Sequence, residues 1–384
     1  MNRRLTVVAA ALGVVTLVGG CSTLDSINPF ASKSKVKAAE LQAISATTEI
    51  RSVWQANVGK AGDYVFVPAV VGSSVYAAAT DGSVTRLDEG KAAWKIQTGT
   101  TLSGGVASDG KTVVVGSAKG EVIALSATDG SQLWRSKVSS EVLAPAAFAP
   151  GMVIVRSGDY RITALDLVDG KRKWLYQRDT PALSLRSEAS PLVVDRYVFV
   201  GFPGGKLVAL MLNNGVPAWD GTVALPKGTT ELDRVADIVA SPVLSGRDIC
   251  AVAYQGRVAC FDLNSGQLSW SRDVSSSSGL DVDSRRVYVT DDKGNVLAFD
   301  RSTGSSVWKQ DKLGYRNLTA PKVIGPYVVV ADLKGVVHFL RREDGAFAAR
   351  FNLDGSPVEA ALQAYGAGVA VQSLAGSVHV IEPK

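Results

Sequence analysis

Apolar and polar positions along the chain follow a pattern that recurs about every 40 residues. Each copy contains a glycine turn, a short and mostly apolar run, a polar turn that again ends in glycine, and a tryptophan four residues later. A second apolar run precedes each copy. Short runs that are rich in valine and aromatic residues and bounded by glycine turns predict β-strands rather than helices. The copies that contain the tryptophan end at Trp94, Trp134, Trp174, Trp219, Trp270 and Trp308.

Two further copies lack the tryptophan. In one of them Ala349 stands at the tryptophan position, and in the other the chain ends at Lys384 before reaching it. A seventh tryptophan, Trp54, precedes the first complete copy. Four strands in a unit of about 40 residues is the period of a β-propeller blade. We therefore expect an all-β fold over residues 50–384: an eight-bladed β-propeller of four-stranded antiparallel blades, whose N-terminal strand closes the last blade.

The strand that follows each glycine turn is apolar on both faces, as in the segment 122–125. An antiparallel sheet with one solvated face would instead alternate between apolar and polar residues. Burial of both faces is typical of a blade that packs between two neighbours. We expect each tryptophan to lie on an outer strand and to fill the gap to the adjacent blade, where it buries up to about 250 Å².

The N-terminus has the pattern of a secretory signal. A basic start is followed by an apolar run from Leu5 to Val18 and by two glycines, so we expect residues 1–20 to be a signal peptide. The order Val18-Gly19-Gly20-Cys21 resembles the lipobox of bacterial lipoproteins, which implies cleavage before Cys21 and lipidation of its thiol. Ser22 after the cysteine resembles the signal for sorting to the outer membrane. The expected location is therefore the periplasmic face of the outer membrane, with a lipid anchor.

Residues 21–49 are small, polar and weakly patterned, and we expect Cys21 to continue into a flexible tether. The segment Lys35–Ile44 is compatible with one or two helical turns. The propeller would then begin at residue 50.

Composition excludes several classes of function. With two His and three Cys, the chain cannot build a Cys/His zinc framework or a scaffold of many disulfides, and a His-dependent active site is disfavoured. Lys and Arg number 41 against 36 Asp and Glu, and no basic cluster stands out, which argues against nucleic acid as a partner. We expect no metal and no cofactor.

The string A-L-D-x-x-x-G-x-x-x-W at Ala164–Trp174, and nearly so at Ala298–Trp308, resembles the tryptophan-docking repeat of quinoprotein dehydrogenases that use pyrroloquinoline quinone. The same repeat occurs in a non-enzymatic family, the BamB lipoproteins of the outer-membrane β-barrel assembly machinery. The resemblance to the BamB family covers essentially the whole chain. It implies a monomeric, non-catalytic scaffold subunit that binds the periplasmic domains of BamA and assists insertion of barrel proteins. Nascent outer-membrane proteins are further partners if they add a strand to an exposed blade edge.

Two strings resemble the adjacent inter-blade loops with which that family binds BamA: SLRSEASP at Ser184–Pro191 and TELDRVADIVASP at Thr230–Pro242. The 51-residue spacing between the tryptophans around the second string independently indicates an enlarged loop, and loops on rigid scaffolds often bind partners. In the alternative interpretation Leu183 and Leu185 cap a blade. Arg186 then pairs internally with Glu188 or Asp237. Val239 stands where the family often has a second Asp. The candidate contact residues are Leu183, Leu185, Arg186, Arg234 and Asp237.

Two other functions remain as alternatives. A quinoprotein dehydrogenase would need adjacent cysteines, a set of calcium-ligating oxygens and long loops over the quinone, and this sequence supplies none of these. A periplasmic glycan-binding propeller would place a ring of aromatic side chains at its inner turns, where this chain has small or charged residues. We therefore interpret the chain as a scaffold and not as an enzyme.

The remaining His and Cys residues fit packing roles. His338 and His379 occupy the same repeat position, three residues after the turn glycine, and we expect packed side chains rather than metal ligands. Cys260 stands where four other repeats have Ala. Cys250 lies on the preceding strand, so a three-residue turn would bring the two cysteines face to face, whereas a two-residue turn would not. A disulfide between Cys250 and Cys260 is left open by the sequence.

Overall fold

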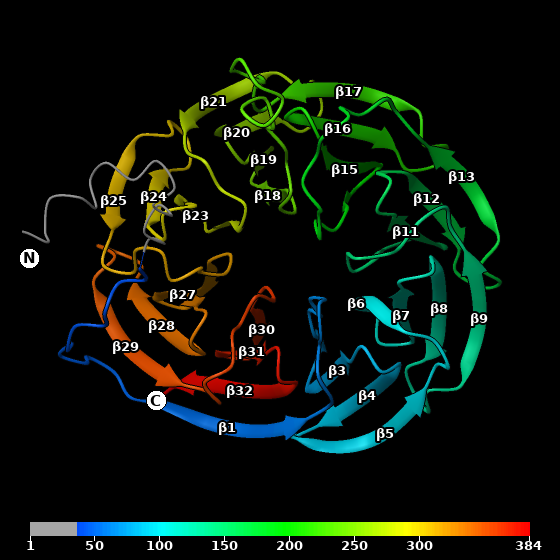
Figure 1. The fold of residues 1–384 in the computed structure, drawn as a ribbon, viewed down its shortest axis with the longest axis horizontal. Coiled ribbons are helices and arrows are strands. Elements are labelled where there is room, and N and C mark those ends of the chain that lie inside the picture. Colours follow the sequence, from blue (N-terminus) through cyan, green and yellow to red (C-terminus); the bar gives the residue numbers. More distant parts are fainter. Residues whose placement is uncertain (1–36) are drawn as a thin grey trace, which may run out of the picture. The chain divides into compact units, whose positions relative to one another are not determined.

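Eight four-stranded antiparallel sheets are arranged in a ring in the computed structural model, which describes residues 37–384 (Figure 1). The described residues contain strands, turns and loops but no helix. The expected all-β, eight-bladed propeller is confirmed. Among residues 37–384, no helix has the length and apolarity needed to cross a membrane.

Seven blades are built from consecutive strands, the first of each blade being innermost and the last outermost (Figure 1). The first four are β2 (Ala69–Val71), β3 (Ser74–Ala78), β4 (Ser83–Asp88) and β5 (Lys91–Gln97); β6 (Leu102–Ser108), β7 (Thr112–Ser117), β8 (Glu121–Ser126) and β9 (Gln132–Lys137); β10 (Ala147–Ala149), β11 (Met152–Arg156), β12 (Ile162–Asp166) and β13 (Arg172–Tyr176); and β14 (Leu192–Val194), β15 (Tyr197–Phe202), β16 (Lys206–Met211) and β17 (Pro217–Thr222). The next three are β18 (Val243–Ser245), β19 (Asp248–Val252), β20 (Arg257–Asp262) and β21 (Leu268–Asp273); β22 (Gly279–Val282), β23 (Arg286–Thr290), β24 (Val296–Asp300) and β25 (Ser306–Gln310); and β26 (Lys322–Ile324), β27 (Tyr327–Ala331), β28 (Val336–Arg341) and β29 (Phe347–Asn352).

The eighth blade joins the two ends of the chain. Its three inner strands are β30 (Gln363–Tyr365), β31 (Gly368–Gln372) and β32 (Ser377–Pro383), and its outer strand is β1 (Ile50–Asn57). Strand β1 pairs with β32 from Ile50 opposite Pro383 to Asn57 opposite Ser377. The N-terminal strand therefore closes the ring as the sequence predicted, and the third and fourth strands of this blade are not joined by a turn.

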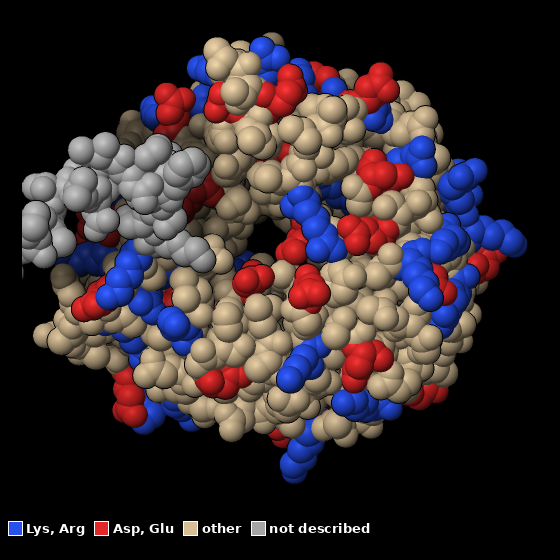
Figure 2. Space-filling model, viewed as in Figure 1, with Lys and Arg blue, Asp and Glu red and all other residues tan. Residues whose placement is uncertain are grey.

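Strand alternation gives the ring two faces with different connections. Because successive strands are antiparallel, the connections between blades and the second-to-third turns lie at one end of each blade, which we call the loop face. The first-to-second and third-to-fourth turns lie at the other end, which we call the turn face. The view along the ring axis shows an opening at its centre with acidic and basic side chains at the rim (Figure 2).

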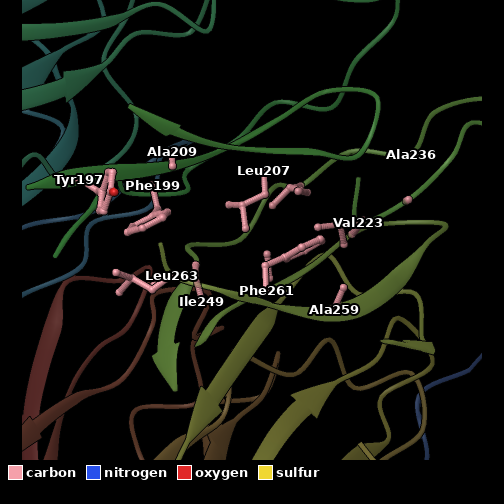
Figure 3. Close-up of a cluster of buried hydrophobic side chains, with 14 residues drawn as sticks. Tyr197, Phe199, Leu207, Ala209, Val223, Ala236, Ile249, Ala259, Phe261 and Leu263 are labelled. Atoms are coloured by element: carbon pink, nitrogen blue, oxygen red, sulfur yellow. The ribbon is translucent and has the colours of Figure 1, made fainter. Parts of the chain in front are cut away.

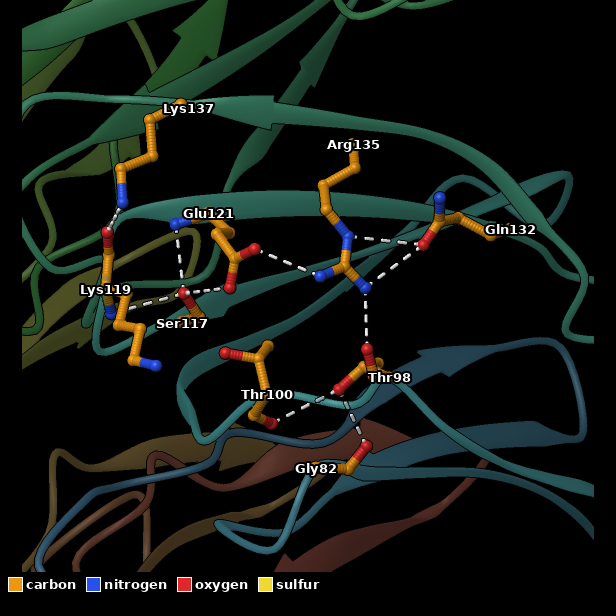
Figure 4. Close-up of polar contacts among 9 residues, drawn as sticks. All are labelled: Gly82, Thr98, Thr100, Ser117, Lys119, Glu121, Gln132, Arg135 and Lys137. Atoms are coloured by element: carbon orange, nitrogen blue, oxygen red, sulfur yellow. Dashed lines mark hydrogen bonds and ion pairs between the residues drawn. The ribbon is translucent and has the colours of Figure 1, made fainter.

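The core lies between neighbouring blades. The middle strands are buried along their length, as in β7 and β11, whereas outer strands such as β9 alternate between exposed and buried residues. One cluster joins the blades β14–β17 and β18–β21, and in it Phe199, Leu207 and Phe261 lie between the two sheets (Figure 3). Polar contacts add to this packing on the loop face: Arg135 of β9 pairs with Glu121 at 3.0 Å and donates to the carbonyl of Thr98 in the preceding connection at 2.6 Å (Figure 4).

Each docked tryptophan packs on a glycine of the next blade. Trp308 of β25 shows the arrangement: its Nε1–H donates to the carbonyl of Arg342 at 3.0 Å, and its ring lies against Gly345, where a Cβ would be 2.5 Å from the indole. Gly345 also has a φ of +73°, which favours glycine. Five other tryptophans make the same hydrogen bond to the next blade: Trp94, Trp134, Trp174, Trp219 and Trp270.

Ala349 takes the tryptophan position where ring closure removes the docking turn. It pairs with Phe339 as Trp308 pairs with Ala298, so its register is that of the other units. In the next blade, however, the end of β32 and the start of β1 lie where the third-to-fourth turn would be. Ala349 is buried in a cluster against which Ile50, at the start of β1, also packs. The missing tryptophan therefore follows from where the ring is opened.

The structure changes the expected extent of the tether. The sequence assigned residues 21–49 to a flexible tether, but Ala38–Lys384 form one compact unit. We call Ala38–Glu49 the strap. Its described part has none of the helical turns expected between Lys35 and Ile44. Its backbone is hydrogen-bonded to backbone and side-chain groups of the propeller. These bonds join Ala39 to Gly314 and Arg316, Gln42 to Arg350, and Thr47 to Ala348. The signal sequence 1–20 and Cys21 lie outside the described residues.

Candidate functional site

Two neighbouring inter-blade connections form the candidate site on the loop face. The first loop, residues 177–191, joins β13 to β14, and the second loop, residues 223–242, joins β17 to β18. Both contain the strings singled out from the sequence. Besides the contact described next, they are joined where Ser190 N donates to Ser241 Oγ at 2.9 Å and where Ser187 Oγ donates to the carbonyl of Val239 at 3.3 Å.

Asp237 is buried and holds the first loop in place. Its carboxylate accepts the backbone N–H of Leu185 at 2.7 Å and that of Gly204 at 3.0 Å, and the residue is 1% exposed. From the sequence, Asp237 is expected to contact a partner directly. The structure instead makes it a positioning residue, because both carboxylate oxygens are occupied by backbone donors beneath the surface.

The other side of the first loop is held by β11 and the turn that follows it. Tyr160 donates its hydroxyl to the carbonyl of Leu185, and Arg156 donates to the carbonyl of Ala189 at 3.3 Å. The Arg156 guanidinium lies 5.1 Å from the centre of the Tyr160 ring. Burial lowers the pKa of Arg156 to about 10, although the nearby Tyr160 and Asp237 oppose that shift. The first loop is thus fixed at Leu185 from two sides.

Arg186 projects from the fixed loop toward two other connections. Its guanidinium pairs with Glu141 at 3.1 Å and lies 5.2 Å from the centre of the Tyr64 ring, while the side chain remains 48% exposed. The alternative interpretation expected pairing with Glu188 or Asp237, and neither is its partner. Arg186 therefore combines a fixed position with donor groups that remain accessible.

Exposed leucines occur on both loops. Leu183 is 45% exposed and Leu185 is half-buried, while Leu225 and Leu232 of the second loop are 59% and 72% exposed. Arg234 is exposed as well, but it is engaged within its own loop, pairing with Glu231 at 3.4 Å and donating to the carbonyl of Gly228. Exposed apolar side chains beside an arginine have the chemistry of a protein-binding surface.

Several residues of this site were not singled out from the sequence. Leu232 is an apolar residue in the otherwise polar stretch 227–234, and that contrast was a signal for an exposed contact, whereas Leu225 follows Val223 and Ala224 and gave no such signal. Tyr64 and Glu141 gave no such signal, because they come from distant connections that only the closed ring brings to Arg186.

The central channel contains a further pair of acidic residues. A cavity of about 470 Å³ is lined by the innermost strands and the connections that lead into them, including Glu188, Ser241, Asp281 and Glu359. Desolvation by the surrounding cavity, and then repulsion from Glu359, raises the pKa of Glu188 to about 7, although the side chain still reaches solvent. None of the described residues that line this cavity is aromatic, which gives a bound sugar no ring to stack on.

The His and Cys residues of the described segment 37–384 lie in the blade interiors. His338 is completely buried, 2.9 Å from the Asp332 carboxylate, which also pairs with Arg316, and burial lowers the pKa of His338. His379 is buried beside Ser377. Within residues 37–384, no group of three or more His, Cys, Asp and Glu side chains is arranged to hold a metal ion.

Cys250 of β19 and Cys260 of β20 are directly opposite in register. The connecting turn has three residues, 254–256. The backbone N–H of Ala253, just before the turn, donates to the carbonyl of Arg257, just after it. The two Sγ atoms are joined as a disulfide in the structure. Both cysteines lie in the buried cluster between the blades β18–β21 and β22–β25, away from the channel.

Comparison with known proteins adds the family to this geometry. The family model described as outer membrane protein assembly factor BamB matches residues 80–310. Outer membrane protein assembly factor BamB of Bordetella pertussis is 42% identical over 377 residues, which covers 96% of each chain. The chain belongs to the BamB family. The Escherichia coli member is 36% identical and also covers 96% of each chain.

Solved structures separate the BamB family from enzymes of the same fold. BamB from Moraxella catarrhalis superimposes with a TM-score of 0.82 at 31% identity, covering 87% of this chain and 100% of that one. Quinohemoprotein alcohol dehydrogenase from Comamonas testosteroni reaches 0.70 at 14% identity, covering 87% and 76%, and this likeness concerns the fold alone. Since the BamB relatives are named assembly factors, family membership makes the chain a non-enzymatic protein with PQQ-like repeats.

Proposed function

We propose that this protein is an outer-membrane lipoprotein that acts as a non-catalytic scaffold in the assembly of β-barrel proteins, and that it binds the periplasmic domains of BamA through the first and second loops. The relatives are named for outer-membrane protein assembly. The observation that carries the partner proposal is the fixed first loop, which presents Arg186 and Leu183 at the surface, while the adjoining second loop exposes Leu232.

Rigidity supports this assignment of the surface. Binding costs less conformational entropy when the contact residues are already ordered. The first loop is ordered by Asp237 on one side and by Tyr160 on the other. A small cluster of leucine and arginine side chains on such a support fits the centre of a protein interface, where a few residues carry most of the binding energy.

The test is capture of BamA by the purified protein. Arg186→Glu combined with Leu183→Asp is expected to lower BamA recovery at least tenfold, since hot-spot residues each contribute about 2 kcal/mol or more. Arg172→Glu, an exposed arginine on β13, is the matched control and should leave recovery unchanged. If the double variant captures as much BamA as the control, these loops are not the BamA site.

A charge swap separates partner contact from local stability. Arg186→Glu with Glu141→Arg restores the internal ion pair with its sign reversed. If Arg186 acts on BamA, the swap restores the thermal stability of the protein but not the capture of BamA. Recovery of both would show that Arg186 only positions its surroundings.

We further propose that Cys21 carries the lipid that anchors the protein at the periplasmic face of the outer membrane. The lipobox-like order around Cys21 supports this proposal. Cys21→Ser is expected to move the protein from the membrane fraction to the soluble periplasmic fraction, and the mass of the mature wild-type N-terminus should include the acyl chains. An unmodified Cys21 in the wild-type protein would disprove it.

Nascent barrel proteins are proposed as transient partners of the outer blade edges. Outer strands such as β9 have no strand paired on their outward side, so an extended chain can add one there. A photo-crosslinker at the exposed Leu133 of β9 is expected to capture unfolded barrel precursors during export. The same probe at Val168, an exposed turn residue, should capture none.

A further inference from the structure

An arginine-rich cavity lies on the turn face, at the opposite end of the blades from the first and second loops. Its volume is about 580 Å³, within the range typical of small-molecule sites. It is formed by the β22–β23, β26–β27 and β28–β29 turns together with the strap, and we call it the arginine pocket. The lining residues are Thr47, Asp283, Ser284, Arg285, Arg286, Pro326, Tyr327, Arg341, Arg342 and Glu343.

The charges in the arginine pocket are predominantly positive. Four guanidinium groups face two carboxylates, those of Asp283 and Glu343. Asp283 is already saturated by donors: Oδ1 accepts the backbone N–H groups of Arg285 and Arg286, and Oδ2 accepts the Tyr288 hydroxyl at 2.7 Å and pairs with Arg342 Nε at 3.3 Å. Glu343 is therefore the acidic group that opposes an incoming anion.

Two of the arginines are held in place by the fold. Arg286 Nη1 donates to the carbonyls of Arg342 and Glu343, which ties β23 to the β28–β29 turn of the next blade. Arg342 is oriented by Asp283 through its Nε, so its two terminal nitrogens stay available. The pocket thus has pre-positioned donors before any ligand arrives.

Arg285 supplies a guanidinium that no other residue of the described segment engages. Its side chain is exposed and makes no hydrogen bond or ion pair with any other residue of the segment 37–384. Arg341, by contrast, is paired with Asp344 through two nitrogens. An unpaired arginine beside fixed ones is an arrangement suited to closing on an anion.

We propose that the arginine pocket binds the phosphate group of an organic phosphate, either a lipid headgroup or a soluble phosphorylated compound. Guanidinium forks match phosphate oxygens in geometry and form strong charge-assisted hydrogen bonds with them. A phosphate offers several acceptor oxygens, so it can engage Arg285 and Arg342 together. The hydroxyls of Ser284, Thr47 and Tyr327 line the same cavity and provide neutral donors for the rest of the ligand.

This inference is independent of the proposed BamA binding, because the pocket and the two loops lie on opposite faces. The experiment uses the mature full-length chain carrying Cys21→Ser, so that no lipid on Cys21 contributes to membrane binding. One arm titrates inorganic pyrophosphate by calorimetry, and the other measures flotation with phosphatidylglycerol vesicles against phosphatidylcholine vesicles.

Three variants are expected to change pyrophosphate affinity in three different ways. Arg285→Gln is expected to weaken pyrophosphate binding about tenfold, because one charge-assisted contact is lost. Glu343→Gln should strengthen binding several-fold, since it removes the opposing charge, and a misfolded variant would not do so. Arg247→Gln is the control: Arg247 is another exposed arginine on the turn face, it lies outside the pocket, and its loss should change nothing.

The two arms identify the source of the phosphate. Flotation with phosphatidylglycerol vesicles that Arg285→Gln abolishes would assign a lipid headgroup, whereas pyrophosphate binding without flotation would assign a soluble phosphate compound. Absence of binding in both arms would overturn the proposal. So would equal affinities for Arg285→Gln, Glu343→Gln and Arg247→Gln.

Discussion

The carboxylate of Asp237 accepts a 2.7 Å hydrogen bond from the backbone N–H of Leu185, 52 residues earlier in the chain. This bond connects the second loop to the first and is buried beneath the surface on which Leu183 and Arg186 are exposed. The candidate site therefore has two layers, a positioning residue below and contact residues above.

Asp237→Asn is expected to destabilise the protein and to loosen the first loop. The amide nitrogen of the new side chain would face one of the two backbone N–H groups that now donate to the carboxylate. One buried N–H group would then lose its acceptor, which costs about 2–3 kcal/mol of folding free energy. Chemical denaturation measures the loss, and hydrogen exchange at Leu185 and Gly204 should accelerate. Glu231→Gln, which changes an exposed carboxylate of the same loop, should alter stability by less than about 0.5 kcal/mol. Unchanged exchange at Leu185 would contradict this role.

Restoring the repeat pattern at Ala349 is expected to weaken the fold. Ala349→Trp introduces an indole where no glycine turn can receive it, and overpacking against Ile50 costs about 1–3 kcal/mol. Trp308→Ala should cost about 3–5 kcal/mol, because Trp308 has both its glycine and its carbonyl acceptor. Denaturant unfolding of both variants is the measurement. A stabilised Ala349→Trp protein would show that closure does not explain the missing tryptophan.

The pair Cys250 and Cys260 is expected to be oxidised in the mature protein. Intact-mass measurement before and after reduction should differ by two hydrogens. Closing a loop of this length contributes roughly 3 kcal/mol in the chain-entropy model, so reduction should lower the unfolding midpoint. The double variant Cys250→Ala, Cys260→Ala should behave like the reduced protein, since alanine fills the position of Cys260 in four other repeats. No mass difference would mean that the thiols are free.

Glu188 is expected to make stability depend on pH. Its folded-state pKa is raised to about 7 from 4.5, so the folded protein holds this proton more tightly than the unfolded chain does. Stability is then highest below pH 4.5 with respect to this group and falls as pH rises from 4.5 to about 7. Glu188→Gln should therefore raise the melting temperature at pH 8 relative to wild type, and the difference should disappear near pH 4.

The partner variant Glu359→Gln provides the control for this titration. Removing the Glu359 charge should lower the pKa of Glu188, as followed by NMR of its carboxyl carbon, because repulsion from Glu359 adds to the effect of desolvation. A melting-temperature difference for Glu188→Gln that is the same at every pH would contradict the assignment.

Much of the candidate site could be located from the sequence, but its internal roles could not. The strings around Arg186 and Asp237 lie on the two loops that the structure brings together. Whether a loop side chain points outward or inward depends on the blades beneath it, and Asp237 points inward. Glu141 and Tyr64 meet Arg186 only because the ring brings separate connections to one face.

The sequence by itself determined the propeller, because each unit carries its own strands and six of the eight copies also carry the turn glycine and the tryptophan. These are local patterns, and eight copies leave one closed arrangement that buries both faces of every blade. Only the tertiary structure decided what depends on the joined ends. Ala349 lies in a cluster with Ile50 at the start of β1, where other units have a docking turn, and the strap is held by Arg316 and Arg350. Those contacts link residues about 300 positions apart, and no local pattern encodes them.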